Sequence, residues 1–332
     1  MKNILIIHTG GTFGMNPMKP DKTLQPGELE SIFDKYIPTL NTIANIEVKI
    51  PFNLDSSDIG PAEWKKTYEI VYQNKDKFDG FVIIHGTDTL VYNATALSFL
   101  LNDFYKPVIF TGSQRPLSEI RTDASSNLIN SVELATLSIN EVGICFGSNL
   151  FRANRTKKIS IESYNGFDSP NCQPLATIGL NIKLNKTLLL QKQKDIQLKP
   201  VFDKNILHVR VFPGLNPEFY YDLVNDNIRA VVIEAFGAGN FPSKSSAWIN
   251  FINKCTSSNK LVVIGSQSIH GMVDLELYAS AKKAFNLGAI SIHDMTFESA
   301  LVKLMILFGN YTDLEKIKSI FNTPIAGEFT LN

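Results

Sequence analysis

Short apolar runs alternate with segments of helical periodicity through the first half of the chain. The runs are rich in Ile, Val and Phe, and their near-continuous hydrophobicity is typical of strands that are covered on both faces. They lie at 3–8, 46–50, 80–85, 107–111 and 142–147. The helical patterns between them lie at 61–77, 89–104 and 122–138. This alternation predicts a mostly parallel sheet with helices on both of its faces.

The segment 61–77 has the clearest helical pattern of the three. Its aromatic residues Trp64, Tyr68 and Tyr72 recur at helical spacing. Pro61 suits the first helical position, and Asp58 is the candidate N-cap.

A lysine-rich segment at 186–204 interrupts the alternation. It contains five lysines and no helical periodicity, which predicts a linker. Beyond it, strands are predicted at 206–211, 229–234 and 260–265, and helices at about 217–226, 245–257, 275–286, 297–308 and 312–321. The predicted fold class is α/β with two three-layer domains. Residues 1–185 form the larger one, with a mixed, mostly parallel sheet, and residues 205–332 form the smaller one, with a parallel, flavodoxin-like sheet.

Composition narrows the range of partners. The chain has 32 basic and 32 acidic residues, whereas nucleic-acid binders usually carry a basic excess. We therefore expect a small-molecule partner and no nucleic acid. The chain has no apolar run of roughly 18 residues, so no membrane span is expected.

Cysteine and histidine usage adds two further expectations. The three cysteines are widely spaced, which indicates a reducing compartment and predicts a cytoplasmic location. The five histidines show no metal-ligand spacing, so no metal and no cofactor are expected.

Polar residues follow four predicted strands at their carboxyl ends, where ligands bind in open α/β sheets. The four clusters lie at 9–12, 55–58, 86–89 and 112–115. Glycines among them let backbone N–H groups approach a ligand closely. Hydroxyls and carboxylates on one edge suit nucleophilic attack with an oxyanion site. The same residue types are also ordinary turn and cap residues, so the pattern alone leaves both interpretations open.

The glycines at 10, 11 and 14 also resemble a phosphate-binding loop. A dinucleotide fingerprint requires a helix directly after such glycines. Residues 14–27 contain three prolines instead of a helical pattern, which argues against a dinucleotide cofactor.

Five segments together carry a specific resemblance. They are HTGGTFGM (8–15), DSSD (55–58), HGTDT (85–89), TGSQRPLSEIRTDA (111–124) and NRTKK (154–158). In this order, and over nearly the whole chain, they resemble the bacterial type I, cytoplasmic L-asparaginases of the asparaginase/glutaminase family. The resemblance implies hydrolysis of L-asparagine to L-aspartate and ammonia through an acyl-enzyme. It also implies a homodimer or a dimer of dimers, with sites at subunit contacts.

The resemblance further implies roles for individual residues. Thr12 is the attacking nucleophile, and a second triad accompanies it. The catalytic set is Thr12, Thr87, Asp88 and Lys158. The substrate-binding set is Asp55, Ser56, Ser57, Thr87, Asp88 and Asn240, of which Asn240 approaches the site of the neighbouring subunit.

The lysine of the triad poses a question of protonation. A threonine hydroxyl requires a base, and a lysine serves as one only when neutral. Lowering a lysine pKa from ~10.4 to ~7.4 destabilises the charged form by about 4 kcal/mol. Burial favours this change and a neighbouring carboxylate opposes it. Our hypothesis is that Asp88 orients Lys158 and binds the substrate ammonium, while closure of the site removes water.

Neighbouring residues invite weaker assignments. Lys157 precedes Lys158 in an extended segment and is predicted to point the other way. His8 and His85 end apolar runs, so they are predicted to be core histidines rather than acid–base catalysts. Residues 13–27 are predicted to form a lid over the site.

The chain departs from the family pattern at two places. Many members carry a lid tyrosine that helps to activate the nucleophile, and Leu24 lies nearest that position. Some type I enzymes bind a regulatory asparagine through an arginine, a threonine and a cysteine. The matching positions are Glu234, Lys157 and Ser268. Since a carboxylate at 234 repels a substrate carboxylate, no asparagine allostery is expected.

Three alternatives stay open at this point. A glutaminase-leaning specificity differs by one methylene, which a pocket discriminates by only ~1–3 kcal/mol. The amidase subunit of an archaeal-type tRNA amidotransferase shares the motifs, but such chains carry an extra N-terminal domain and here the first motif begins near residue 9. A catalytically silent amino-acid sensor would use the same pocket, although the intact catalytic set argues against it.

Overall fold

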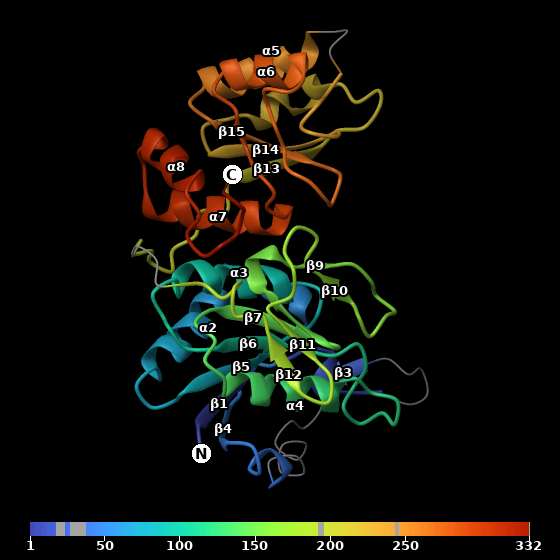
Figure 1. The fold of residues 1–332 in the computed structure, drawn as a ribbon. Helices are drawn as coiled ribbons and strands as arrows, with labels where there is room; N and C mark the ends of the chain where they lie inside the picture. The colour runs from blue at the N-terminus through green and yellow to red at the C-terminus, as the bar shows by residue number, and fades with distance from the viewer. Residues whose placement is uncertain (18–23, 27–37, 192–195, 243–245, 332) are drawn as a thin grey trace. The chain divides into compact units, whose positions relative to one another are not determined.

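The chain divides into two compact units in the computed structural model. The structure describes residues 1–17, 24–26, 38–191, 196–242 and 246–331. The first unit is Met1–Gln197 and the second is Leu198–Asn332. The boundary lies within the lysine-rich segment 186–204, whose described residues form neither helix nor strand (Figure 1).

An eight-stranded sheet organises the first unit. Its strand order is β12-β11-β8-β7-β6-β5-β1-β4. The strands are β1 (Asn3–His8), β4 (Asn45–Lys49), β5 (Gly80–Ile84), β6 (Val108–Thr111), β7 (Val142–Phe146), β8 (Asn149–Arg152), β11 (Ala176–Ile178) and β12 (Ile182–Leu184). Pairing is parallel from β4 to β7 and antiparallel from β7 to β12. The carboxyl ends of β1, β4, β5 and β6 therefore share one edge.

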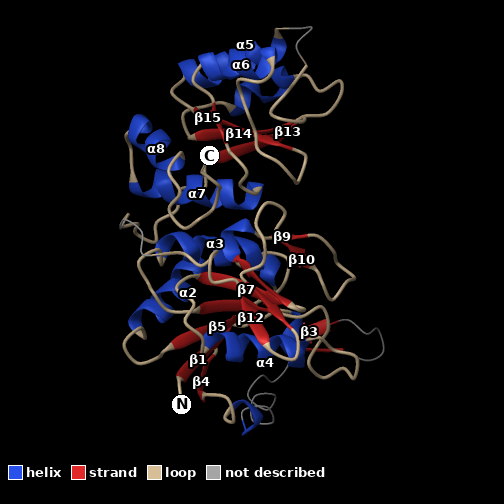
Figure 2. Ribbon diagram, viewed as in Figure 1, coloured by secondary structure: helices blue, strands red, loops and turns tan. Residues whose placement is uncertain are grey.

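Helices cover both faces of this sheet (Figure 2). One core layer joins Val71 of α2 (Pro61–Gln73) and the buried side of α3 (Leu90–Leu100) to alternate residues of the central strands, such as Leu5. The other layer joins α4 (Ala124–Ala135) to the opposite residues, such as Ile4. Because side chains alternate along a strand, a continuous apolar run feeds both layers. The three-layer α/β architecture of the predicted larger domain is confirmed.

Short elements lie around the sheet. They are η1 (Thr12–Gly14), β2 (Met15–Pro17), β3 (Leu24–Pro26), η2 (Ser56–Asp58), η3 (Ala153–Arg155), β9 (Lys157–Lys158) and β10 (Phe167–Asp168). β2 and β3 pair as an antiparallel ribbon, with Pro17 opposite Leu24. Of the lid predicted at 13–27, residues 18–23 and 27 lie outside the described residues.

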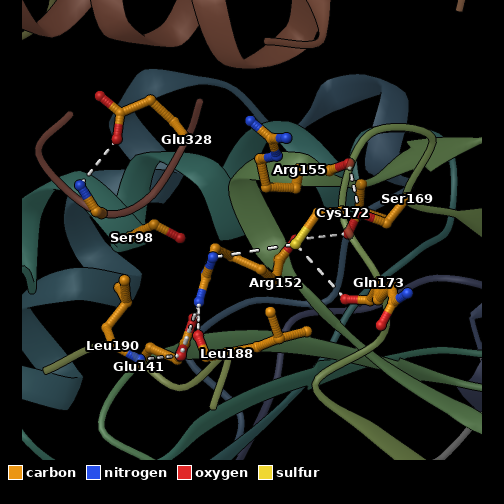
Figure 3. A network of polar contacts seen from close by, with 12 residues as sticks. Ser98, Glu141, Arg152, Arg155, Ser169, Cys172, Gln173, Leu188, Leu190 and Glu328 are labelled. Carbon is orange, nitrogen blue, oxygen red and sulfur yellow. Dashed lines mark hydrogen bonds and ion pairs between the residues drawn. The ribbon is translucent and has the colours of Figure 1, made fainter. Parts of the chain in front are cut away.

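A buried ion pair ties the end of the first unit to its sheet (Figure 3). Arg152 Nε donates to Glu141 Oε2 at 2.6 Å, and both side chains are almost fully buried. Glu141 also accepts from the backbone N–H of Leu190 at 2.9 Å, while Arg152 donates to the carbonyl of Leu188. Each charge thus has hydrogen-bond partners, as burial of an ion pair requires.

The second unit contains a four-stranded parallel sheet in chain order, β13-β14-β15-β16. Its elements are β13 (Ile206–Arg210), η4 (Pro217–Leu223), β14 (Ala230–Ala235), α5 (Ala247–Ser257), β15 (Leu261–Ser266), α6 (Ala279–Asn286), β16 (Ile290–Ser291), α7 (Phe297–Asn310) and α8 (Leu314–Phe321). Figure 1 shows α5 and α6 on one face of this sheet and α7 and α8 on the other. In a flavodoxin-like sheet, the direction in which successive strands are added reverses at one strand. The described strands of the second unit show no such reversal, so the sheet is parallel, as predicted, without the flavodoxin strand order.

A fully buried lysine–carboxylate pair anchors the C-terminal segment within the second unit. Lys303 Nζ lies 2.5 Å from Glu328 Oε1, and it donates to the carbonyls of Phe321 and Thr323 at 2.8 Å. Glu328 in turn accepts from the backbone N–H of Ile325 at 3.0 Å. Burial lowers the pKa of Lys303, although the Glu328 carboxylate opposes this shift.

Several predicted boundaries were wrong. Helix α2 ends at Gln73 rather than 77, because Asn74 caps it and its side chain donates to the Ile70 carbonyl. Its N-cap is Gly60, not Asp58, and Glu63 accepts from the Gly60 N–H. The helix predicted at about 217–226 is a 3₁₀ helix of seven residues.

Candidate active site

Glycines bring the strand-end turns into direct contact. A Cβ on Gly11 would lie 2.3 Å from the Cα of Gly86, and one on Gly86 would lie 2.7 Å from the Cβ of Ser56. A Cβ on Gly112 would lie 2.4 Å from the carbonyl oxygen of His85. No side chain fits at such distances, so glycine permits the turns after β1, β5 and β6 and the residues of η2 to meet. The predicted convergence of four polar clusters is thus present.

Thr12 begins a short 3₁₀ helix directly after two glycines. Gly10 and Gly11 have φ values of 117° and 84°, which favour glycine. The Gly11 N–H donates to the Leu54 carbonyl at 3.0 Å and fastens the turn to the segment after β4. Thr12 is half-buried, and the described residues supply no hydrogen bond to its hydroxyl. The threonine is therefore held by its backbone, with its hydroxyl uncommitted.

The second threonine is hydrogen-bonded to the predicted lysine. Lys158 Nζ donates to Thr87 Oγ1 at 2.8 Å and to Asp88 Oδ1 at 2.7 Å. The Thr87 and Lys158 side chains are largely buried, whereas the Asp88 side chain is 67% exposed. Lys158 lies in β9, about 70 residues after Asp88 in the sequence. The tertiary structure therefore assembles three of the four predicted catalytic residues through direct hydrogen bonds.

The segment after β4 places its three polar residues differently. Ser56 is buried, and its hydroxyl accepts from the Asp88 N–H at 3.3 Å. Asp55 and Ser57 are exposed, and Ser57 donates to Asp55 Oδ1 through its N–H at 2.8 Å and its hydroxyl at 2.7 Å. These hydrogen bonds lower the pKa of Asp55, so it carries a negative charge at neutral pH. A buried hydroxyl and an exposed anion thus lie together beside the Thr87 turn.

Two buried histidines form hydrogen bonds to the backbone of the Thr12 and Thr87 turns. The Gly10 N–H donates to His8 Nδ1 at 3.0 Å, and His85 Nδ1 donates to the Gly86 carbonyl at 2.8 Å. Burial lowers the pKa of His8 to about 3 and that of His85 to about 4, and His85 adds to the shift at His8. Both rings are neutral at neutral pH. The predicted burial of both histidines is confirmed, whereas His85 Nε2 has no hydrogen-bond partner among the described residues.

Asn240 lies in the second unit, in the turn after β14. Its side-chain oxygen accepts from the Ser280 hydroxyl and from the Phe241 N–H. Its carbonyl accepts from the Phe236 N–H at 2.8 Å. The side chain is half-buried in its own unit, and its role toward a neighbouring subunit stays a prediction.

The three positions that match a regulatory site have distinct surroundings. The Glu234 carboxylate lies 3.3 Å from Arg210 Nη1 and 3.6 Å from His208 Nε2. Lys157 lies in β9 opposite Asp168, and Ser268 is exposed after β15. The Glu234 carboxylate of β14 therefore pairs with the Arg210 side chain of the neighbouring strand β13.

A buried polar network beside the site was not assigned from sequence. Asp123 accepts from the N–H groups of Gln114 and Arg115, and from the side chain of Asn127 at 3.2 Å. Asn127 also donates to the Gly112 carbonyl at 2.9 Å. The only sequence signal is the position of Asp123 directly before a helix, which is typical of an N-cap. Its side chain instead caps the turn after β6.

Two of the three cysteines are buried, and the described residues contain no metal-binding cluster. Those residues include no group of three or more His, Cys, Asp or Glu that could bind a metal ion. Burial raises the pKa of the Cys145 and Cys255 thiols to about 12, so both are neutral. Among the described helices, none combines the length and apolarity needed to cross a bilayer.

Comparison with known proteins identifies the family of the chain. Residues 3–190 match the family model "Asparaginase, N-terminal", and residues 205–321 match "Glutaminase/Asparaginase C-terminal domain". The chain belongs to the asparaginase/glutaminase family. It is therefore an amidohydrolase, as the sequence motifs predicted.

Individual members of the asparaginase/glutaminase family align along the whole chain. L-asparaginase 1 of Escherichia coli is 33% identical, covering 99% of this chain and 98% of that protein. A glutamyl-tRNA(Gln) amidotransferase subunit of Pyrococcus horikoshii is 32% identical, covering 99% of this chain and 77% of that protein. The crystal structure of L-asparaginase I from Vibrio cholerae superposes with a TM-score of 0.90, at 32% identity and 99% coverage of each chain.

Proposed function

We propose that the chain is an L-asparaginase that hydrolyses L-asparagine to L-aspartate and ammonia through a threonine acyl-enzyme. The observation that carries the proposal is the position of Lys158 Nζ, within 2.8 Å of Thr87 Oγ1 and 2.7 Å of Asp88 Oδ1. A base in hydrogen-bond contact with a hydroxyl and oriented by a third group is the arrangement of a catalytic triad, and we assign this Lys158–Thr87–Asp88 set to proton transfer beside the attacking Thr12. The similarity to L-asparaginase 1 supports the substrate.

Thr12 is the nucleophile in this proposal, whereas Thr87 belongs to the set that transfers protons. Thr12 Oγ1 attacks the side-chain carbonyl carbon of asparagine, and its proton passes to the base. The C–N bond then breaks, and the nitrogen leaves as ammonia after receiving a proton. Water adds to the resulting ester and releases aspartate and free Thr12. The contact between Gly11 and Gly86, the residues before the two threonines, supports their cooperation at one centre.

Lys158, Thr87 and Asp88 supply the proton transfers. Lys158 accepts a proton only in its neutral form, and its side chain is largely buried beside Thr87 and Asp88. Asp88 is exposed on the other side and is free to bind the substrate ammonium as well as to orient Lys158. Asp88 thus has the role of the carboxylate that orients the base in other catalytic triads.

Residues 55–57 are proposed to bind the α-amino and α-carboxylate groups. Asp55 is an exposed anion that suits an ammonium group. Ser56 accepts from the Asp88 N–H through its hydroxyl oxygen and keeps its own proton to donate to a carboxylate. Ser57 holds Asp55 in place through two hydrogen bonds.

Assembly and location complete the proposal. We expect a homodimer or a dimer of dimers in which Asn240 of one copy approaches the site of the other, and a cytoplasmic location. Light scattering coupled to size-exclusion chromatography measures the assembly directly. An active monomer would remove the proposed contribution of Asn240 from a second copy.

Ammonia release from asparagine and from glutamine tests the function. Wild-type protein is expected to prefer asparagine, and Thr12→Ala is expected to lose roughly a thousandfold or more in turnover. Retained binding without turnover in the wild type would identify a sensor instead. Higher turnover with glutamine would place the chain among glutaminases. Asp88→Asn is the second test, because unchanged turnover would eliminate both roles of Asp88.

A further inference from the structure

The loop at residues 112–123, here called the bridging loop, contacts both the turn that carries Thr12 and the segment that carries Lys158. At one end, the Leu117 N–H donates to the Phe13 carbonyl at 3.1 Å, next to Thr12. At the other end, Gln114 Nε2 donates to the carbonyls of Ser160 and Ser163 at 3.2 and 3.0 Å. These two serines lie in the Lys158 hairpin, defined as residues 157–168. One loop therefore contacts the Thr12 turn and the element that carries the lysine.

The Lys158 hairpin has little regular pairing, and its apolar anchor is Phe167, which is buried against Phe146 at the base of the hairpin. β9 and β10 pair over only two residues, with Lys158 opposite Phe167. Ile159 N–H donates to the Gly166 carbonyl at 2.8 Å and extends the pairing by one step. Ile159 and Ile161 are exposed, so little apolar packing holds this part of the hairpin. A short exposed ribbon of this kind is marginally stable alone.

Gly166 makes room for the Gln114 side chain. A Cβ at Gly166 would lie 2.6 Å from Gln114 Nε2 and 3.2 Å from the Ser160 carbonyl oxygen. Glycine at this position therefore lets the amide reach two carbonyls of the hairpin at once. A second tie runs from the Tyr164 hydroxyl to the Arg121 carbonyl at 2.8 Å.

The bridging loop is itself rigidly held. The buried Asp123 carboxylate accepts from the Gln114 N–H at 3.0 Å and from the Arg115 N–H at 3.1 Å. Asn127, on the first turns of α4, donates to Asp123 and to the Gly112 carbonyl. Hydrogen bonds from two elements to one buried carboxylate fix the backbone at Gln114.

We propose that Gln114 is a positioning residue that holds Lys158 in register with Thr87 and Asp88, through the backbone carbonyls of Ser160 and Ser163. This inference rests on the proposed role of Lys158 as the base of the reaction. Displacement of a reacting group by about 1 Å costs on the order of a hundredfold in rate. Residues 55–57 lie on a different segment, and Asp88, which we also propose to bind substrate, is held by its own N–H to Ser56, so Gln114 should affect the chemical step more than substrate binding.

Gln114→Leu removes the amide donor and keeps a side chain of similar size. We expect kcat to fall by roughly 30- to 100-fold while KM changes by less than about threefold. Tyr164→Phe cuts the second tie and should reduce kcat by about threefold in a hairpin that keeps the Gln114 contacts. Arg121→Ala is the matched control, because the Tyr164 hydroxyl donates to the backbone carbonyl of Arg121, which this substitution keeps.

A double-mutant cycle with Lys158→Met separates positioning from a general structural role. If Gln114 acts through Lys158, then Gln114→Leu causes no further loss of kcat in the Lys158→Met background. Equal losses in both backgrounds, or a kcat for Gln114→Leu within about twofold of wild type, would overturn the proposal. Wild-type turnover in Lys158→Met would contradict the proposed function itself.

A crystal structure of the Gln114→Leu protein gives a readout that does not depend on activity. We expect the distance from Lys158 Nζ to Thr87 Oγ1 to exceed the hydrogen-bond limit of about 3.5 Å, with the Asp123 contacts intact. An unchanged distance in that structure would contradict the positioning role even if the protein proved inactive toward both amides.

Discussion

Two lysine–carboxylate pairs of this molecule have similar distances and opposite surroundings. In the second unit, Lys303 lies 2.5 Å from Glu328, and both side chains are fully buried. In the first unit, Lys158 lies 2.7 Å from Asp88, whose side chain is 67% exposed. Distance alone would rank the two pairs as equivalent.

The difference lies in how the donors are used. A lysine ammonium has three N–H donors. Those of Lys303 meet Glu328 and two backbone carbonyls. Lys158 donates to Thr87 and Asp88 alone among the described residues. A saturated, dry pair fixes a structure, whereas an unsaturated pair that opens to water on one side is available for proton transfer.

Lys303→Met has the largest expected effect on stability. Glu328 would then remain buried without a counter-charge, and we expect the free energy of unfolding of the second unit to fall by about 3–5 kcal/mol. Urea unfolding measures this in a Trp64→Phe background, where Trp248 reports on the second unit. The companion Lys303→Met/Glu328→Gln variant should recover part of the loss. A loss below about 1 kcal/mol would show that the pair is not what anchors the C-terminal segment.

Lys158→Met should have the complementary effect. We expect kcat for ammonia release to fall by about a thousandfold, with a midpoint of thermal unfolding close to wild type, because the Asp88 carboxylate left without its partner is 67% exposed and stays hydrated. Lys157→Met is the control: it lies next to Lys158 in β9, on the opposite face of the ribbon. Comparable losses from both substitutions would mean that the hairpin, rather than the Lys158 amine, is the sensitive feature.

The buried histidines predict a pH dependence of stability confined to the first unit. Folded-state pKa values of about 3 for His8 and about 4 for His85 lie below the unfolded value of ~6.5. The unfolded chain therefore binds more protons below pH ~6.5, and stability falls as the pH drops toward the folded-state values. Between pH 7 and pH 5 we expect a loss of about 2 kcal/mol per histidine.

Urea unfolding at both pH values, in a Trp248→Phe background where Trp64 reports, measures that loss. His8→Asn should remove about half of it, and His270→Gln, at an exposed position, should leave it unchanged. A stability that is flat from pH 7 to pH 5 would mean that the two rings are charged or solvated in the folded protein.

The smallest expected effect concerns cooperativity. Glu234 faces Arg210 and His208, so the matching position presents a carboxylate where an asparagine carboxylate would have to bind. We expect the rate to depend hyperbolically on asparagine concentration, with a Hill coefficient near one. A sigmoidal curve would require a second asparagine site built from other residues.

Much of the fold followed from local patterns. Strands β1, β5 and β7 were predictable because each is a continuous apolar run whose residues feed two core layers. Strands β8, β11 and β12 were not predicted: each has only three or four residues, and their antiparallel pairing arises where the chain folds back after β7. Helix ends were less predictable than helices, since single side chains such as Asn74 decide them.

The sequence by itself determined the family, the α/β class and the two threonine turns. Thr12 and Thr87 follow strand ends and lie beside glycines that no other residue could replace at those contact distances. These features are local, because a strand, a glycine turn and a hydroxyl occupy consecutive residues. Motif and structure therefore agree on them.

Only the tertiary structure decided how Lys158 reaches Thr87 and what holds it there. The lysine lies about 70 residues from its partners in sequence, and the intervening chain supplies Gln114 and Asp123, which hold the hairpin that carries the lysine. Gln114 and Asp123 look like ordinary turn and cap residues in the sequence. Their contacts depend on long-range backbone placement, and a hydrogen bond to a distant carbonyl leaves no periodicity in a sequence.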